Sequence, residues 1–314
     1  MDKRIFAADI GGTTVKLGMF TIEGELLDKW EIDTRKENNG GFILPDIAAS
    51  IKAKMESENI EKEDVIGIGV GAPGPVDKNG VIYKAVNLGW GVLNIKEELE
   101  KLTGVTVMAG NDANVAALGE MWKGGGEGYS DLVVVTLGTG IGGGVIIDGR
   151  IVTGYKGAGG EIGHIHINDD ETEVCGCGNK GCFEQYASAT GIARLANRKL
   201  GSSNEDSVLR KCEINAKTVF DAVKAGDKLA MEIAEEFGEY LGKGLANVAD
   251  VTNPEVFVIG GGVSKAGQVI IDYGQKNFKK YVFHACRDAK FVLAKLGNDA
   301  GIYGAAKLVV QNTD

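Results

Sequence analysis

Apolar and polar residues follow a strand–turn–strand pattern that occurs twice along the chain. Residues 4–20 consist of an apolar strand, a turn rich in glycine and threonine, and a second strand of alternating character. A third candidate strand follows at 25–32. The same order returns at 132–147 and again ends in an acidic residue and a glycine. With Gly11 aligned on Gly138 the two copies agree without gaps, which predicts a duplicated domain rather than a solenoid.

The pattern after each hairpin predicts alternating helices and strands. In the first half we expect helices at 44–57, 95–102 and from Asp112, and strands at 65–70 and 105–109. In the second half we expect a long amphipathic helix at 228–251, a strand at 256–259, and helices from Lys265 and at 301–310. This order is typical of a mixed α/β fold in which an antiparallel hairpin opens each half.

Composition is that of an ordinary globular protein, except for glycine. The 314 residues are enough for two domains or two lobes around a cleft. Glycine contributes 48 residues and proline only 4, which favours tight turns and close backbone approach to ligands. The net charge of −10 disfavours binding to nucleic acid or anionic lipid, because no basic patch offsets it. No signal-peptide core and no apolar run near ~20 residues is found, so we expect a cytoplasmic protein.

Two glycine-rich stretches match the spacing G-x-G-x-x-G, at residues 138–143 and 69–74. A dinucleotide fingerprint must open a helix, whereas the first stretch runs into an apolar strand and the second into Pro75. A nicotinamide enzyme is therefore disfavoured. Backbone N–H groups in such tight turns can still form a nest for phosphate.

Other residues of these turns could assist in binding a nucleotide. Thr13, Thr14 and Thr139 could add hydroxyl donors to the nest. Asp9, at the end of an apolar strand, could meet Mg²⁺ directly or through water. The alternative for Asp9 is a turn-capping role, which we consider the weaker interpretation beside two phosphate-type turns.

The cysteines point to a metal rather than to disulfides, because three of the five fall in one short segment. The five are Cys175, Cys177, Cys182, Cys212 and Cys286. Zinc prefers four tetrahedral nitrogen or sulfur ligands, and His164 and His166 both lie shortly before the segment. A closed set of three cysteines and one histidine would be structural. The other two cysteines are expected to be inert buried thiols.

Three carboxylates are candidates for contact with a polar substrate. Asp112 follows a predicted strand and begins a predicted helix, so it either caps that helix or acts as a general base. A helix N-terminus would favour its ionised form. Glu161 and Glu184 flank the cysteine segment and could bind sugar hydroxyls, unless they are solvated surface charges.

Taken in order, these motifs resemble the ROK family, the "repressor, open reading frame, kinase" group, and within it the glucokinases. The resemblance covers essentially the whole chain. It rests on Asp9–Thr13, Asn111–Asn114, Ala117–Glu120, Gly138–Gly144, Glu161–His164, Cys175–Gly178, Gly181–Glu184 and Gly260–Gly262. It implies a duplicated actin-like, ribonuclease-H-like ATPase fold, with lobes at 1–114 (plus helix 300–314) and at 115–299.

The resemblance also implies a role for each matching residue. Asp112 would be the base that takes the proton of the sugar 6-hydroxyl. The sugar would be held by Asn111, Glu161, His164 and Glu184, with Gly74 and Asn87 as further contacts. ATP and Mg²⁺ would be bound by Asp9, Gly11, Gly12, Thr13, Thr14, Gly138, Thr139, Gly140, Gly142 and Gly261. Zinc would be bound by His164, Cys175, Cys177 and Cys182, although a spacer longer than the family pattern keeps His166 as a rival ligand.

The expected activity is ATP-dependent phosphorylation of a hexose, with glucose favoured by the stretch at residues 87–90. N-acetylmannosamine, fructose, mannose and allose remain alternatives, and the sequence does not show whether polyphosphate can replace ATP. A sugar-responsive repressor is disfavoured because the first strand begins by Ile5, which leaves no room for a DNA-binding domain before it. A non-catalytic sugar sensor is a weaker alternative, and a homodimer is expected.

Overall fold

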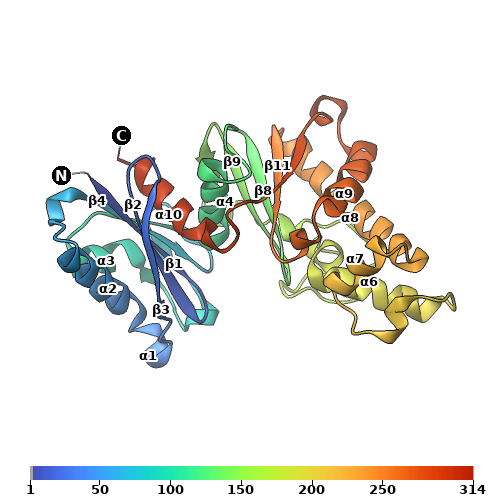
Figure 1. Ribbon diagram of the computed structural model, residues 1–314, viewed down its shortest axis with the longest axis horizontal. Coiled ribbons are helices and arrows are strands. Elements are labelled where there is room, and N and C mark those ends of the chain that lie inside the picture. Colours follow the sequence, from blue (N-terminus) through green and yellow to red (C-terminus); the bar gives the residue numbers. More distant parts are fainter. Residues whose placement is uncertain (1–2, 314) are drawn as a thin grey trace. The chain divides into compact units, whose positions relative to one another are not determined.

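The computed structural model describes residues 3–313, so residues 1–2 and 314 of the first expected lobe lie outside the described residues. The chain forms two five-stranded sheets and divides into two compact units (Figure 1). The first unit comprises Met1–Gly128, Gly144–Gly160 and Leu296–Asp314. The second comprises Tyr129–Gly143 and Glu161–Lys295.

The first sheet has the strand order β3-β2-β1-β4-β7. Its strands are β1 (Arg4–Ile10), β2 (Thr14–Phe20), β3 (Leu26–Asp33), β4 (Val65–Ala72) and β7 (Val107–Asn111). The first three form an antiparallel meander, while β4 and β7 run parallel to β1. Parallel strands are usually buried on both faces of a sheet. The sequences of β1 and β4 are accordingly apolar along most of their length.

Helices cover both faces of this sheet because successive side chains of β1 point in opposite directions. Phe6 and Ala8 belong to one apolar cluster, with side chains of α2 (Ile43–Ser57) and α3 (Ile95–Thr103). Ile5 and Ala7 belong to the other cluster, with side chains of α4 (Asp112–Lys123) and α10 (Ala300–Val310). The last helix of the chain therefore packs in the first unit (Figure 1).

The second sheet repeats this topology strand by strand, in the order β10-β9-β8-β11-β12. Its strands are β8 (Leu132–Leu137), β9 (Ile141–Ile147), β10 (Arg150–Ile151), β11 (Val256–Gly260) and β12 (Lys290–Leu293). Strand β10 pairs antiparallel with β9, β9 is the neighbour of β8, and β11 and β12 again run parallel to β8. The duplication predicted from the two hairpins is thus confirmed.

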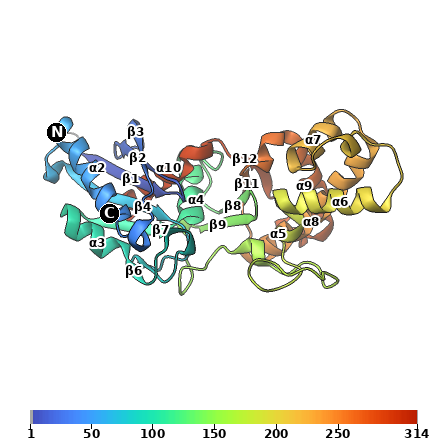
Figure 2. The same ribbon diagram turned by 90° about the horizontal axis from the view of Figure 1, so that it is seen from below.

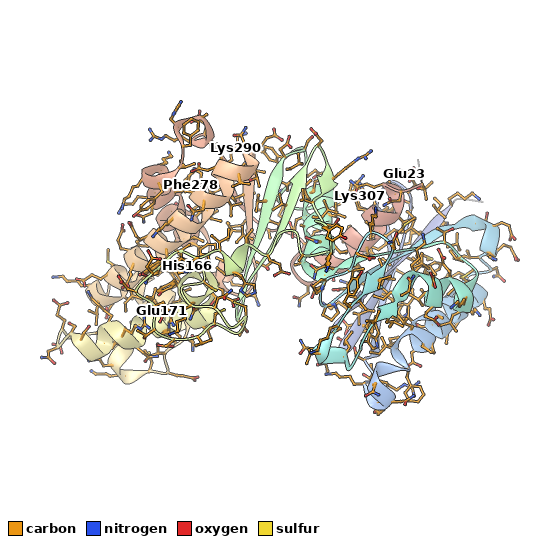
Figure 3. All side chains as sticks on the ribbon, turned by 180° about the vertical axis from the view of Figure 1, so that it is seen from behind. Glu23, His166, Glu171, Phe278, Lys290 and Lys307 are labelled. Carbon is orange, nitrogen blue, oxygen red and sulfur yellow. The ribbon has the colours of Figure 1, made fainter. Side chains whose placement is uncertain are left out.

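The helices of the second unit form a group beside β11 and β12 (Figure 2). They are α5 (Glu184–Ala187), α6 (Ala189–Ser202), α7 (Ala216–Lys224), α8 (Lys228–Thr252) and α9 (Gln268–Tyr281). Phe278 of α9 joins Phe257 of β11 and Phe291 of β12 in one aromatic group (Figure 3). Within residues 3–313, no helix is both long enough and apolar enough to span a bilayer.

The predicted element boundaries differ from the structure in three places. The helix expected from Lys265 begins at Gln268, because a 3-10 turn at Val263–Ala266 and Gly267, whose φ is +85°, precede it. Strand β7 lies two residues later than expected. Strand β12 was not predicted, although Phe291-Val292-Leu293 is an apolar run. Short elements α1 (Glu37–Gly40), β5 (Val81–Ile82) and β6 (Leu93–Asn94) also belong to the first unit. Of the two cysteines expected to be buried, Cys286 is buried but Cys212 is exposed.

Candidate active site

The first glycine turn joins β1 to β2 in a conformation that only glycine allows at its first position. The N–H of Gly11 donates to the carbonyl of Thr14 at 3.0 Å, and a Cβ on Gly11 would lie 2.7 Å from that oxygen. Thr34 fixes the turn from outside, since its hydroxyl donates to the carbonyl of Gly11 at 2.8 Å. Gly12 and Thr13 are exposed at the tip. Their backbone N–H groups are therefore available to an anion.

Asp9 lies just before this turn in an environment that disfavours its charge. Burial raises the pKa of Asp9 to about 6, the nearby charge of Asp112 adds to this rise, and Lys16 opposes it. Helix α10 packs closely here, because a Cβ on Gly301 would lie 2.9 Å from Asp9 Oδ1. A divalent cation beside the two carboxylates would reverse the shift. Sequence reasoning missed Lys16, although it pairs directly across the hairpin from Asp9.

Asn111 caps helix α4 and also positions its neighbour. Its Oδ1 accepts a hydrogen bond from the N–H of Asn114 at 3.1 Å. Its Nδ2 donates to the carbonyl of Gly74 at 3.1 Å and to Asp112 Oδ1 at 3.0 Å. The structure thus brings Asn111 and Gly74, two predicted sugar contacts, together with the predicted base Asp112. Because Asn111 is the cap, Asp112 is left in the first turn, half-buried, at the positive end of the helix.

The predicted contact Asn87 lies in a separate exposed turn. It belongs to a 3-10 turn at Val86–Leu88 that is closed by backbone hydrogen bonds between Ala85 and Trp90. Trp90 is buried and its Nε1 donates to the carbonyl of Gly40 at 3.1 Å. Among the described residues, the side chain of Asn87 makes no hydrogen bond to Gly74 or Asn111.

The second glycine turn occupies the same place between two strands as the first and is held by the start of helix α6. The N–H of Gly138 donates to the carbonyl of Gly140 at 3.0 Å, and Ala189 N–H donates to the carbonyl of Gly138 at 2.8 Å. The hydroxyl of Thr190 donates to the carbonyl of Thr139, a contact that the sequence did not suggest. Gly261 lies against the same region, because with a φ of +83° its Cβ would meet the backbone of Leu137 at 2.6 Å. Gly142 lies next to the turn, in β9.

Four side chains of the cysteine segment and the preceding turn converge on one point. The ligand atoms of His164, Cys175, Cys177 and Cys182 all lie within 4.8 Å of one another. Cys175 Sγ is 3.9 Å from His164 Nδ1, and Cys177 Sγ is 3.6 Å from Cys182 Sγ. Zinc–sulfur bonds of about 2.3 Å in a tetrahedron place sulfur atoms about 3.8 Å apart, so this donor set fits such an ion.

His166, the rival ligand, is engaged elsewhere. Its Nδ1 lies 2.9 Å from the carbonyl of Lys180, and its Nε2 lies 2.8 Å from Asp169 Oδ1. Both ring nitrogens therefore have partners outside the group of four. The hydrogen bond to Asp169 raises the pKa of His166, as does the carbonyl of Lys180.

Glu184 connects the cysteine segment to the second glycine turn. Its Oε1 lies 3.0 Å from Cys175 Sγ and 3.6 Å from His164 Nδ1. Its Oε2 accepts a hydrogen bond from the N–H of Ile141 at 3.3 Å. Glu161, by contrast, is exposed, and its carbonyl accepts from the N–H of His164 at 3.2 Å. The side chains of Glu184 and His164 are thus neighbours, and Glu161 contacts His164 through the backbone.

The chain belongs to the ROK family, whose model matches residues 5–312. Its fold is the duplicated α/β fold of the actin-like ATPases. A glucokinase of Halalkalibacterium halodurans is 43% identical over 99% of this chain and 96% of its own length. A glucokinase of Thermotoga maritima is 34% identical over 98% of this chain and 97% of its own.

A solved structure is similar over the same extent. It is a ROK family glucokinase from Streptomyces griseus in complex with glucose and AMPPNP. That protein is 34% identical, with a TM-score of 0.75, and the match covers 98% of this chain and 100% of the other. The similarity therefore extends over both units rather than over one motif or one sheet.

Proposed function

We propose that this chain is a glucokinase, which transfers the γ-phosphoryl group of ATP to the 6-hydroxyl of glucose. The relatives named above are glucokinases, and one of them binds glucose and AMPPNP. The observation that carries the proposal is the position of Asp112. It is a carboxylate in the first turn of a helix that a different residue caps, and it interacts with a second carboxylate, Asp9.

In this proposal Asp112 accepts the proton of the 6-hydroxyl as that oxygen attacks phosphorus. The helix N-terminus and the amide of Asn111 keep the carboxylate ionised and oriented. The sugar is held by Asn111, Gly74, Asn87, Glu161, His164 and Glu184. Phosphoryl transfer depends mainly on alignment and charge neutralisation, which backbone N–H groups of the two glycine turns would provide.

Asp9 is the proposed partner of Mg²⁺ in this reaction. Its raised pKa means that its charge is poorly solvated by the protein alone. Mg²⁺ supplies neutralisation of the phosphate charges when it is bound. Gly11 to Thr14, Gly138 to Gly140, Gly142 and Gly261 are the proposed nucleotide contacts. Closure of the expected lobes, 1–114 with 300–314 and 115–299, stays a prediction.

We further propose that the ion held by His164, Cys175, Cys177 and Cys182 is zinc. Ligation through His164 Nδ1, the nitrogen nearest to Cys175, would fix the imidazole ring and leave its other nitrogen for a sugar hydroxyl. No ligand position would remain for water, so the site would be structural. Glu184, 3.6 Å from the same nitrogen, would be oriented with it.

A coupled assay of ADP release across a panel of hexoses tests the function, with zinc measured on the same sample. We expect glucose to give the highest kcat/KM and about one zinc ion per chain. A higher kcat/KM for N-acetylmannosamine or fructose would contradict the choice of substrate. No ADP release with any sugar would favour a sensor and overturn the kinase. The homodimer and the cytoplasmic location remain predictions.

A further inference from the structure

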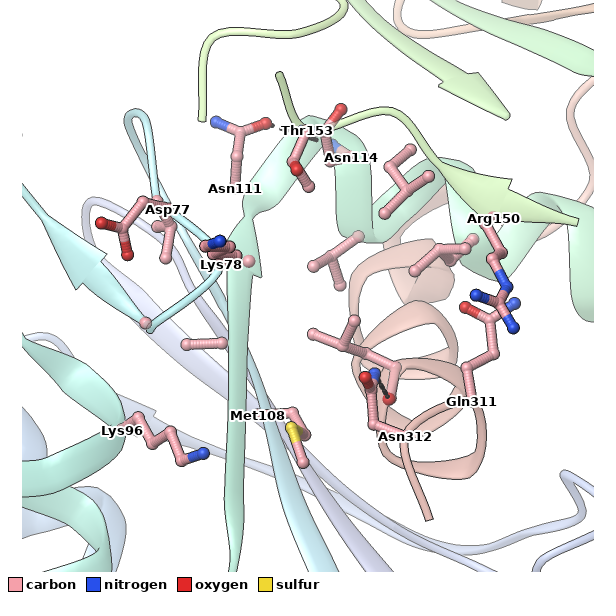
Figure 4. Close-up of a pocket in the computed structure, with 18 residues that line it drawn as sticks. Asp77, Lys78, Lys96, Met108, Asn111, Asn114, Arg150, Thr153, Gln311 and Asn312 are labelled. Atoms are coloured by element: carbon pink, nitrogen blue, oxygen red, sulfur yellow. Dashed lines mark hydrogen bonds between the residues drawn. The ribbon is translucent and has the colours of Figure 1, made fainter. Parts of the chain in front are cut away.

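A cavity of about 270 Å³ lies in the first unit along the free edge of strand β7. It extends from Asn111 at the end of β7 to Met108 near its start, and it reaches Asn312 beyond the last turn of α10 (Figure 4). Its remaining walls are the loop at residues 76–80, helix α4 and the segment at 150–153. Only Asn111 is shared with the proposed sugar contacts, so most of the cavity is a separate feature.

Three cationic side chains from three different segments line this cavity. They are Lys78 in the loop after β4, Lys96 in α3 and Arg150 in β10 (Figure 4). Within residues 3–313, none of the three forms an ion pair. Such a cluster is unusual in a chain with a net charge of −10. Like charges that face one cavity repel one another unless an anion lies between them.

The acid among the cavity residues does not neutralise this cluster. Asp77 Oδ1 accepts hydrogen bonds from the N–H groups of Asn79 at 2.9 Å and Val81 at 3.0 Å. Its Oδ2 accepts from the hydroxyl of Tyr83 at 3.2 Å. The carboxylate therefore serves to fix the loop that carries Lys78, and the cavity keeps an excess of positive charge.

A buried amide adds a second and independent indication of a ligand. Asn114 lines the cavity with 3% of its surface exposed. Its Oδ1 has no hydrogen-bond partner among the described residues. A buried acceptor without a partner costs about 1–3 kcal/mol, and a ligand hydroxyl that reached it would recover that cost. The cavity thus offers cations for an anionic group and an acceptor for a hydroxyl.

We propose that this cavity binds a phosphorylated monosaccharide as a ligand distinct from the substrates. Lysine and arginine from three directions suit the doubly charged, tetrahedral phosphate better than a planar, singly charged carboxylate. A volume of about 270 Å³ has room for one sugar ring with its phosphate but not for a nucleoside triphosphate. The ligand would also contact Asn111, which positions Asp112.

Titration calorimetry with glucose 6-phosphate tests this, with saturating glucose and AMPPNP present so that both substrate sites are filled. We expect saturable binding that is weakened at least about tenfold in the double variant Lys96→Gln/Arg150→Gln. The matched control is Lys52→Gln, an exposed lysine on α2, which should bind as the parent does. Inorganic phosphate alone should bind more weakly, because it lacks the hydroxyl for Asn114.

Three outcomes would overturn the proposal. They are no binding once glucose and AMPPNP are present, equal affinity in the parent and the double variant, and phosphate affinity equal to that of the sugar phosphate. Arg150 is exposed and Lys96 is half-buried, and within residues 3–313 neither forms an ion pair, so the double variant and the Lys52→Gln control should both fold. Unchanged glucose phosphorylation in the double variant, without sugar phosphate added, verifies that the substrate sites are intact.

Discussion

The two sheets share strand order and register, yet they differ in the residue that precedes the glycine turn. Asp9 in β1 pairs with Gly71 of β4, and Thr136 occupies the same place in β8, where it pairs with Gly260 of β11. Both strands continue into a turn whose backbone can hold phosphate. The duplication has therefore kept the strand–turn–strand topology in both copies but the carboxylate in one. The shared topology explains why both sheets have a glycine turn at this place. It does not explain the carboxylate of Asp9, which we attribute to its proposed role in binding Mg²⁺.

A second comparison is between two carboxylates whose charge is opposed by burial, one with a structural role and one in the proposed active site. Glu171 in the second unit (Figure 3) accepts hydrogen bonds from the hydroxyl of Tyr186 at 2.5 Å, from Arg194 at 2.6 Å and from Arg198 at 3.2 Å. Burial opposes its charge, but these donors outweigh burial and lower the pKa of Glu171 to about 2. Among residues 3–313 Asp9 has no such donors, and its pKa rises to about 6. Glu171 is stabilised by the protein itself, whereas Asp9 is suited to an added cation.

The largest effect is expected for Asp112→Asn, which removes the proposed base beside Asp9. Turnover should fall by about 10³-fold, within the range for loss of a general base. The fold should persist, because Asn111 rather than Asp112 caps helix α4. Steady-state kinetics with glucose and ATP measure the effect, and thermal unfolding verifies the fold. Asp206→Asn, at an exposed position of the second unit, is the matched control. Near-normal turnover would refute the role of Asp112.

A smaller effect, on stability alone, is expected for Glu171→Gln. The change leaves Arg194 and Arg198 without their buried partner, which should cost about 3 kcal/mol in the free energy of unfolding. Because the pKa of Glu171 is lowered when folded, its stabilisation is present above pH ~4.5 and is lost as pH falls towards 2. Denaturant unfolding at pH 7 and pH 3 should therefore show a smaller difference at pH 3.

The exposed Glu213→Gln is the control for Glu171→Gln and should leave stability unchanged. An equal loss in the free energy of unfolding at both pH values would mean that the charge of Glu171 does not stabilise the second unit. Loss of glucose phosphorylation in the folded variant would contradict the distinction between scaffold and site, because Glu171 would then act in the reaction.

The sequence was sufficient for the features that depend on short-range pattern. Alternating apolar residues predicted both hairpins, and a strand followed by a helix start placed Asp112 at a helix N-terminus. It also placed Asn111 and Asp112 together, but it could not tell which of them caps the helix. That choice depends on side-chain rotamers, which the order of residues does not specify.

Features that depend on contacts distant in sequence could not be predicted. His164 and His166 lie 11 and 9 residues before Cys175, so sequence distance does not decide between them, whereas the direction of each ring does. The partners of Glu171 lie 23 and 27 residues away on α6, so no local motif marks them. Strand β12 is recognisable mainly by its pairing with β11.

The smallest and most specific effect is expected for Asp9→Asn. Folding raises the pKa of Asp9 from 3.8 to about 6, so stability falls as pH rises through that interval and stays lower above it. The neutral amide removes this cost, and the variant should be more stable than the parent by about 2 kcal/mol at pH 8, without added Mg²⁺, and no more stable at pH 3. Thermal unfolding at both pH values measures this, with the exposed Asp33→Asn as control. The same variant should use Mg²⁺–ATP poorly. A parent more stable than the variant at pH 8 would mean that the protein itself satisfies the charge of Asp9, and the contrast with Glu171 would fail.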